Sequence, residues 1–238
     1  MEQPFDIATP LGPIRFWGRD TGKPLIVVLT GLGAEVWIYD RLQGDFPDAD
    51  VLRTHLPGNH SPRLENASVG GFGAALAKAL ATGFPGRPAT LVGISLGALV
   101  ALACHSSQKT AMVLVEPFLR TGGIPEFRAM FEAAGPGADA ELFWSVLGVG
   151  ADGTENRDYT HLVDRIAVPV EVLFGDAGQT GPRLRSLVDE RDRAAWATQP
   201  LANVTEVAGA GHNVAGYDAQ AFLGAIRTAR RRAHGEAR

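Results

Sequence analysis

Ser95 stands at the centre of a G-x-S-x-G pattern in which strand-like residues precede it and helix-like residues follow it. The apolar run at residues 89–94 predicts a strand, and the run to Cys104, apolar nearly all round, predicts a buried helix. A change from strand to helix within one residue strains the backbone, and the flanking glycines leave the serine hydroxyl exposed. Free N–H groups at the helix start lie beside that hydroxyl. The pattern favours a nucleophilic serine; a glycine-flanked turn serine is the plain alternative.

Apolar runs alternate with helical patterns along most of the chain. Strands are predicted at residues 25–30, 51–55, 89–94, 111–115, 169–174 and 203–207, after a hairpin at residues 5–9 and 14–18. Helices are predicted at residues 34–43, 66–82, 161–166, 182–198 and 219–232. Such alternation implies a mostly parallel sheet with right-handed crossovers, so reactive groups gather at the carboxyl edge of the strands.

The alternation stops after Pro117. Residues 118–159 hold two helical patches, 126–134 and 140–147, and we expect them to form a small cap over the strand ends. Apolar cap residues can pack on the core or line a pocket, and packing is the commoner use of aromatic side chains. At 238 residues the chain fits one α/β domain, residues 1–238, with this cap, residues 118–159, as an insertion.

The composition is that of an ordinary soluble globular protein. Hydrophobic residues make up 45% and charged residues 20%, and the net charge of −4 offers no basis for a nucleic-acid or membrane surface. Cys104 is the single cysteine, so no intrachain disulfide can form, and we expect a small buried hydrophobe there. The first residues lack the basic and apolar segments of a signal peptide, which makes a cytoplasmic location the expectation. The oligomeric state is left open.

Five motifs in order resemble the α/β-hydrolase superfamily, nearly from end to end of the chain. They are T-G-L-G from Thr30, L-P-G-N-H-S from Leu56, G-I-S-L-G from Gly93, P-V-E-V-L-F-G-D from Pro169 and A-G-A-G-H-N from Ala208, which ends in Gly211-His212-Asn213. The resemblance implies the α/β-hydrolase fold: a mostly parallel eight-stranded sheet flanked by helices, with a small helical cap.

By this resemblance Ser95 is the nucleophile and His212, after the last strand, is the base. The oxyanion hole would use the N–H groups of Leu96 and Leu32. Thr30 stands where the family usually has a histidine, but since the donor is a backbone group this change need not abolish the hole.

The acid of the triad has two candidates. The family often writes the loop after the seventh strand as G-x-x-D, but here Gly178 takes the place of the aspartate. Asp176, two residues earlier, is one candidate, or else a cap of the turn. Glu116, which ends its strand directly before Pro117, is the other, because some superfamily members carry the acid there; otherwise it binds loop amides. Either would fix the imidazole tautomer.

The sequence therefore predicts a serine hydrolase that cleaves a small carboxylic ester or related acyl compound through an acyl-enzyme, without a cofactor. A carbon–carbon bond hydrolase or a thioesterase is possible with the same serine and histidine. The rival class is a ligand-binding protein with little or no turnover. The other histidines show no metal-ligand spacing, so no metal is implied.

Overall fold

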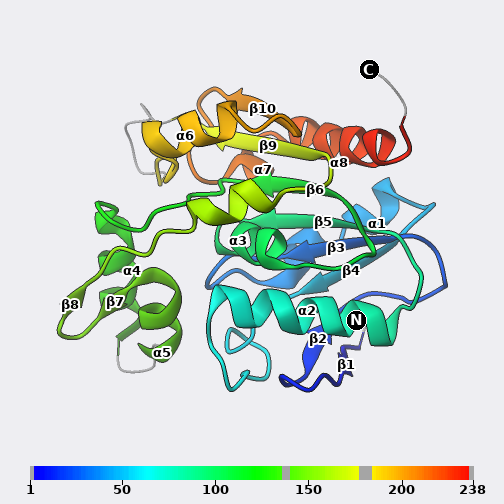
Figure 1. The fold of residues 1–238 in the computed structure, drawn as a ribbon, viewed down its shortest axis with the longest axis horizontal. Helices are drawn as coiled ribbons and strands as arrows, with labels where there is room; N and C mark the ends of the chain where they lie inside the picture. Colours follow the sequence, from blue (N-terminus) through cyan, green and yellow to red (C-terminus); the bar gives the residue numbers. More distant parts are fainter. Residues whose placement is uncertain (1–2, 136–139, 177–183, 236–238) are drawn as a thin grey trace.

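A computed structural model describes residues 3–135, 140–176 and 184–235. Six strands form the central sheet in the order β10-β9-β6-β5-β3-β4, and every neighbouring pair is parallel (Figure 1). The first and last residues of each strand lie within two residues of those predicted. They are β3 (Leu25–Leu29), β4 (Asp50–Thr54), β5 (Ala89–Ile94), β6 (Lys109–Val115), β9 (Val170–Gly175) and β10 (Ala202–Val207).

The remaining two of the eight expected strands form a separate hairpin. β1 (Phe5–Ile7) and β2 (Ile14–Phe16) pair antiparallel. The hairpin meets the large sheet through Trp17 and Arg53, whose backbones exchange two hydrogen bonds of 2.8 Å beside β4. The expected eight-stranded sheet is therefore six-stranded in the described residues, with this hairpin attached at one bridge.

Helices cover both faces of the sheet. In β3, alternate side chains enter two different cores: Leu25, Val27 and Leu29 pack in one, and Ile26 and Val28 in the other. The first core lies under α2 (Val69–Gly83) and α3 (Leu96–Ala103), and the second under α1 (Leu42–Asp45), α7 (Val214–Tyr217) and α8 (Ala219–Ala233). This three-layer arrangement explains why the strands read as continuous apolar runs.

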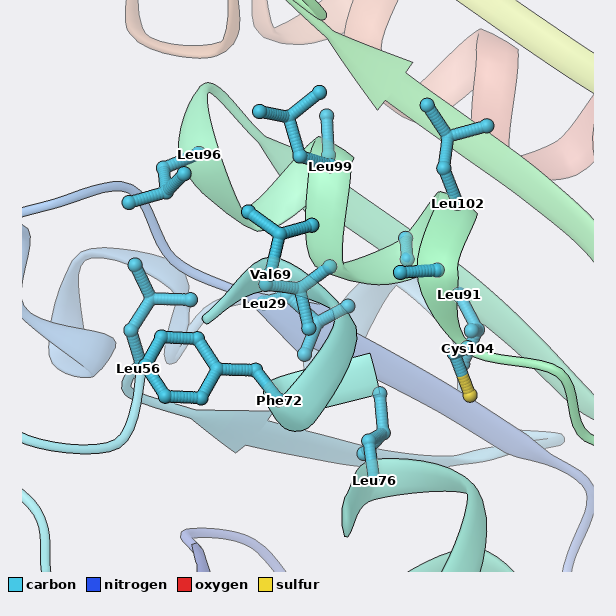
Figure 2. Packing of buried hydrophobic residues seen from close by; sticks show 14 of the residues in the cluster. Leu29, Leu56, Val69, Phe72, Leu76, Leu91, Leu96, Leu99, Leu102 and Cys104 are labelled. Carbon is cyan, nitrogen blue, oxygen red and sulfur yellow. The ribbon is translucent and has the colours of Figure 1, made fainter. Parts of the chain in front are cut away.

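The helix α3 is buried on all sides because it is enclosed between the sheet and α2. Figure 2 shows Leu91 from the sheet, Leu99 from α3 and Phe72 and Leu76 from α2 in one packed cluster. Each residue of α3 is buried, and so is Cys104 after it. The apolar sequence following Ser95 therefore anchors the start of α3 in the core.

The described residues of the segment 118–159 stand beside the carboxyl edge of the sheet (Figure 1). It contains α4 (Pro125–Ala134), α5 (Ala140–Leu142), a π-helical turn (Phe143–Leu147) and the hairpin β7 (Val149–Gly150) and β8 (Gly153–Thr154). Its two ends lie side by side, since the Tyr159 N–H donates to the Leu119 carbonyl at 2.8 Å. Asp192 on α6 (Glu190–Ala197) accepts from the Leu119 N–H at 2.6 Å and thereby fixes this stem to the main domain.

Several predicted helices are wrong or shorter than expected. Residues 34–43 form a 3₁₀ turn (Val36–Tyr39) and the single-turn α1, because a run of β-branched and aromatic residues loses side-chain freedom in a longer helix. In the predicted helix 182–198 only α6 is helical, and residues 184–189 are irregular; residues 182 and 183 lie outside the described part. The segment predicted at 161–166 is a 3₁₀ helix (Thr160–Arg165).

Candidate active site

Ser95 occupies a sharp turn between β5 and α3. Its φ of 55° and ψ of −120° are strained for a residue with a side chain. A Cβ on Gly93 would lie 2.5 Å from the Ala98 Cα, and one on Gly97 would lie 2.3 Å from the Leu29 carbonyl oxygen. Neither position can hold a larger residue without a backbone shift, so the two glycines of the motif permit α3 to start directly against the sheet.

The loop after β3 approaches the serine closely. A Cβ on Gly31 would lie 3.3 Å from the Ser95 Cβ and 3.8 Å from its Oγ, so the residue before Leu32 faces the serine. Leu96 is the first residue of α3, where a helix has N–H groups without intrahelical partners. Thr30 is fully buried, and its N–H donates to the Thr54 carbonyl at 3.2 Å, which ties this loop to the end of β4.

His212 forms a hydrogen bond with Glu116. The distance from His212 Nδ1 to Glu116 Oε2 is 3.0 Å, although 96 residues separate the two along the chain. With Nδ1–H donated to the carboxylate, the tautomer assigned by this bond leaves Nε2 as an acceptor. Among the described residues no hydrogen bond joins His212 to Ser95, and such bonds commonly tighten only when substrate binds.

Glu116 is fully buried and surrounded by donors. It has a φ of 55° at the carboxyl end of β6. Oε1 accepts from the Gly175 N–H at 2.6 Å and the Ser186 hydroxyl at 2.8 Å, and Oε2 accepts from the Leu187 N–H at 2.9 Å. These bonds hold the carboxylate in one orientation while Oε2 also receives His212. Ser186 and Leu187 were missed by sequence reasoning, because their segment resembles the start of a helix.

Asp176, the other predicted acid, follows β9 directly and is half-buried. The hydrogen bond described for the His212 ring is made with Glu116. Gly178, which stands where the family often has the triad aspartate, lies outside the described residues.

Ser95, His212, Leu32 and Leu96 line one cavity of about 260 Å³. The segment 118–159 and the loop before α6 supply six apolar side chains to its wall: Phe118, Phe127, Met130, Leu147, Leu184 and Leu187. In the described part of the chain, His212 is the one ionisable side chain apart from Tyr39 that lines it. The cavity suits an uncharged, largely apolar group next to the serine.

A second histidine–carboxylate group, formed by His55, His60 and Glu35, lies at the loop after β3. His55 Nε2 is 2.9 Å from Glu35 Oε2, and His60 Nε2 is 3.5 Å from Glu35 Oε1. Burial lowers the pKa of His55, while Glu35 acts in the opposite direction. Within the described ranges, no three His, Cys, Asp or Glu side chains are grouped as metal ligands. A membrane span would need a longer or more apolar helix than any the structure describes.

Comparison with known proteins identifies the family. The model of the α/β-hydrolase family matches residues 26–225, and the chain therefore belongs to this family. A comparison with curated protein sequences gives no match.

Solved structures share the fold at low sequence identity. A thermophilic esterase from Thermogutta terrifontis, with malate bound, is 19% identical over 98% of this chain and 99% of its own, with a TM-score of 0.70. The carboxylesterase CesB of Bacillus subtilis is 14% identical over 97% of this chain and 92% of its own, with a TM-score of 0.72. A thioesterase domain from the curacin biosynthetic pathway is 18% identical over 95% of this chain and 99% of its own, with a TM-score of 0.65.

Proposed function

We propose that this chain is a serine hydrolase that cleaves small carboxylic esters through an acyl-enzyme. The observation that carries the proposal is the 3.0 Å hydrogen bond from His212 to the buried Glu116, made beside the cavity that Ser95 also lines. A ligand-binding protein has no physical need for a buried carboxylate that orients a histidine next to a strained serine. Glu116 is thus our choice for the triad acid, in preference to Asp176.

The proposed reaction has two steps. His212 Nε2 takes the proton of the Ser95 hydroxyl as its Oγ attacks the ester carbonyl, and Glu116 stabilises the imidazolium. The N–H groups of Leu32 and Leu96 donate to the oxyanion. The tetrahedral intermediate then collapses: its bond to the alcohol oxygen breaks, and that oxygen takes the proton from His212. Water activated by His212 releases the acid and restores the serine.

The wall of the cavity supports an uncharged acyl group. The Thermogutta terrifontis esterase holds malate, a dicarboxylate. Here the described lining has no arginine or lysine to pair with a carboxylate, and leucine, phenylalanine and methionine predominate. We therefore propose a short or medium alkyl acyl group. With such an acyl group, the expected binding partner is a small-molecule substrate. The cytoplasmic location stays a prediction from the sequence.

The test is hydrolysis of p-nitrophenyl acetate, butyrate and octanoate by wild type and by Ser95→Ala. Ser107→Ala is the matched control, since Ser107 is exposed after α3. We expect Ser95→Ala to lose all turnover above background, Ser107→Ala to retain it, and butyrate to be preferred to octanoate. Equal rates for wild type and Ser95→Ala on every ester would refute esterase activity.

A thioesterase is the second candidate, because the curacin thioesterase domain shares the fold. The same serine, histidine and oxyanion donors serve a thioester, in which a thiol leaves instead of an alcohol. Carbon–carbon bond hydrolysis remains open on the same grounds. Butyryl thioesters assayed beside the oxygen esters separate the first two candidates: a higher kcat/KM for the thioester would favour the thioesterase.

A further inference from the structure

The loop that follows β3 is attached at two points to the end of β4 and the residue after it. At the start of the loop, the Thr30 N–H donates to the Thr54 carbonyl at 3.2 Å. At its end, the Val36 N–H donates to His55 Nε2, also at 3.2 Å. Leu32, whose N–H is the proposed oxyanion donor, lies between these two attachments, so both of them hold the loop that carries it.

The residues between the attachments form a turn that faces the serine. The Ala34 N–H donates to the Gly31 carbonyl at 3.2 Å and closes a turn around Leu32. A Cβ on Gly31 would lie 3.3 Å from the Ser95 Cβ, so the turn lies against the nucleophile. Misplacement of a reacting group by about 1 Å can lower a rate by roughly 10²-fold. The attachment at Val36 therefore bears on catalysis, although it does not touch the substrate.

His55 Nε2 faces two groups that require opposite protonation states. The Val36 N–H needs an acceptor, whereas Glu35 Oε2, 2.9 Å from the same nitrogen, needs a donor. A ring nitrogen of histidine either donates or accepts, so it can serve only one of them at a time. The His55 side chain is 2% exposed, which leaves the choice to the protein groups around it.

The neutral ring serves Val36. A helix has no partner of its own for its first N–H, and the side chain of the capping residue, Glu35, does not supply one to this 3₁₀ turn. Glu35 is 26% exposed and also lies 3.5 Å from His60 Nε2, so it can find another donor. The buried N–H of Val36 would lose more by being left unpaired. His55 Nδ1 has no partner among the described residues in either tautomer and does not affect the choice.

Protonation of His55 reverses the choice. In the imidazolium both ring nitrogens carry a proton, so Nε2–H donates to Glu35 and the Val36 N–H faces another donor. Burial lowers the pKa of His55; Glu35 acts in the opposite direction, and the charge of His60 acts in the same direction as burial. The ring is therefore neutral near pH 7 and takes up its proton only below its usual 6.5.

The other neighbours of the ring leave this balance to the two partners already named. The Trp17 ring, which follows β2, is uncharged and lies 4.7 Å from the His55 ring between centroids. Arg53, two residues earlier at the end of β4, forms an ion pair with Asp40. The titration of His55 thus depends on its burial, on Glu35 and on His60.

We propose that His55 is a positioning residue for the oxyanion donor Leu32, and that it holds the loop in its active position only while Nε2 carries no proton. The proposal rests on the proposed function. As the pH falls, His55 takes a proton from the solvent, Nε2–H turns to Glu35, and the Val36 N–H is released. The oxyanion then loses part of its stabilisation, so kcat falls while KM stays constant, because this donor acts in the transition state.

The test compares kcat for p-nitrophenyl butyrate between pH 7.5 and 5.0. His55→Gln brings an amide oxygen that accepts a hydrogen bond and does not titrate, and His55→Leu removes the acceptor. His105→Gln, at an exposed histidine after α3, is the matched control. Protonation of His212 also stops the reaction at low pH, but it affects every variant and cancels in the ratio of two kcat values.

We expect His55→Gln to retain at least about a third of wild-type kcat at pH 7.5. The ratio of wild-type to His55→Gln kcat should then fall about tenfold by pH 5.0, less than the roughly 10² to 10³ lost when an oxyanion donor is removed altogether. His55→Leu should lose about tenfold in kcat already at pH 7.5, with KM within about twofold of wild type. The ratio of wild-type to His105→Gln kcat should not change with pH.

Nitrogen-15 NMR of the histidine rings and backbone amides keeps the test independent of turnover. At pH 7.5 we expect the proton of the neutral His55 ring on Nδ1. The Val36 and Leu32 amide signals should shift with the same midpoint as that ring, and should not shift in His55→Gln.

The proposal is overturned if Nε2 carries the proton at pH 7.5, if the two amides do not follow the ring, or if the ratio of wild-type to His55→Gln kcat is independent of pH. A rise in KM without a loss of kcat in His55→Leu would also overturn it. If no ester is hydrolysed but the amides follow the ring, the esterase is refuted and His55 remains the residue that positions this loop.

Discussion

Replacement of Glu116 by glutamine perturbs the candidate triad with little change in volume. In the native structure four donors surround the carboxylate: two backbone N–H groups, the Ser186 hydroxyl and His212 Nδ1. A glutamine keeps one oxygen and brings an NH₂ group, which in either orientation faces donors. The variant loses the charge that stabilises the imidazolium, and when its NH₂ group faces Nδ1 it also loses the acceptor that fixes the imidazole tautomer.

Glu116→Gln should change both kcat and the free energy of unfolding. Loss of the oriented imidazole should lower kcat by roughly 10² to 10⁴, which corresponds to about 3 to 5 kcal/mol of barrier. Opposed buried donors should also lower the free energy of unfolding by about 1 to 3 kcal/mol. The assay is saturating p-nitrophenyl butyrate hydrolysis, with urea unfolding of the same preparations.

Asp176→Asn is the matched control, because it makes the same chemical change at the other predicted acid. We expect it to stay within about twofold of wild type, since a partly exposed carboxylate outside the triad contributes little to the barrier. The kcat of Ser186→Ala should lie between those of Glu116→Gln and Asp176→Asn, because Glu116 keeps its other donors. If folded Glu116→Gln retains at least a third of wild-type kcat, or if Asp176→Asn is the variant that loses it, our assignment of the acid is refuted.

Three further predictions concern the residues that support the site. Gly97→Ala should lower the free energy of unfolding by about 1 to 3 kcal/mol and reduce kcat, since its Cβ would lie 2.3 Å from the Leu29 carbonyl oxygen. A Gly97→Ala protein with the melting temperature and kcat of wild type would contradict this. Burial lowers the pKa of His55 below the usual 6.5, so the unfolded chain binds the extra proton first and stability should fall as pH drops below about 6.5. Urea unfolding of wild type and His55→Asn at pH 7.5 and 5.5 measures this, and equal pH dependence in both proteins would count against it. Burial raises the pKa of the Cys104 thiol to about 12, so a disulfide reagent should modify it in urea but not in the native protein; rapid native modification would disprove the packing of α3.

The strands and the elbow could be predicted because local sequence determines them. A Cβ on either glycine around Ser95 would lie 2.5 Å or less from backbone atoms, so both positions require glycine. A short buried strand can be recognised from its own run of apolar residues. The acid was left undecided because its identity depends on which distant carboxylate reaches His212. Glu116 lies 96 residues from it, and its supporting donors come from a third segment that resembles a helix.

The helix predicted at residues 34–43 failed for a different reason. Its apolar residues lie at helical spacing, but the structure uses them in a 3₁₀ turn whose Val36 N–H donates to the buried ring of His55, 3.2 Å away. This tertiary contact and the low helix propensity of the β-branched and aromatic residues both favour the short turn.

The most direct measurement of the central claim is the site at which a fluorophosphonate attaches. We would treat wild type, Ser95→Ala and Ser107→Ala with the probe, measure intact masses and map the modified peptide. The account predicts one stoichiometric adduct on Ser95 in wild type and in Ser107→Ala, and none in Ser95→Ala. A folded wild-type protein that stays unlabelled, or one labelled at another residue, would contradict the assignment of Ser95 as an activated nucleophile.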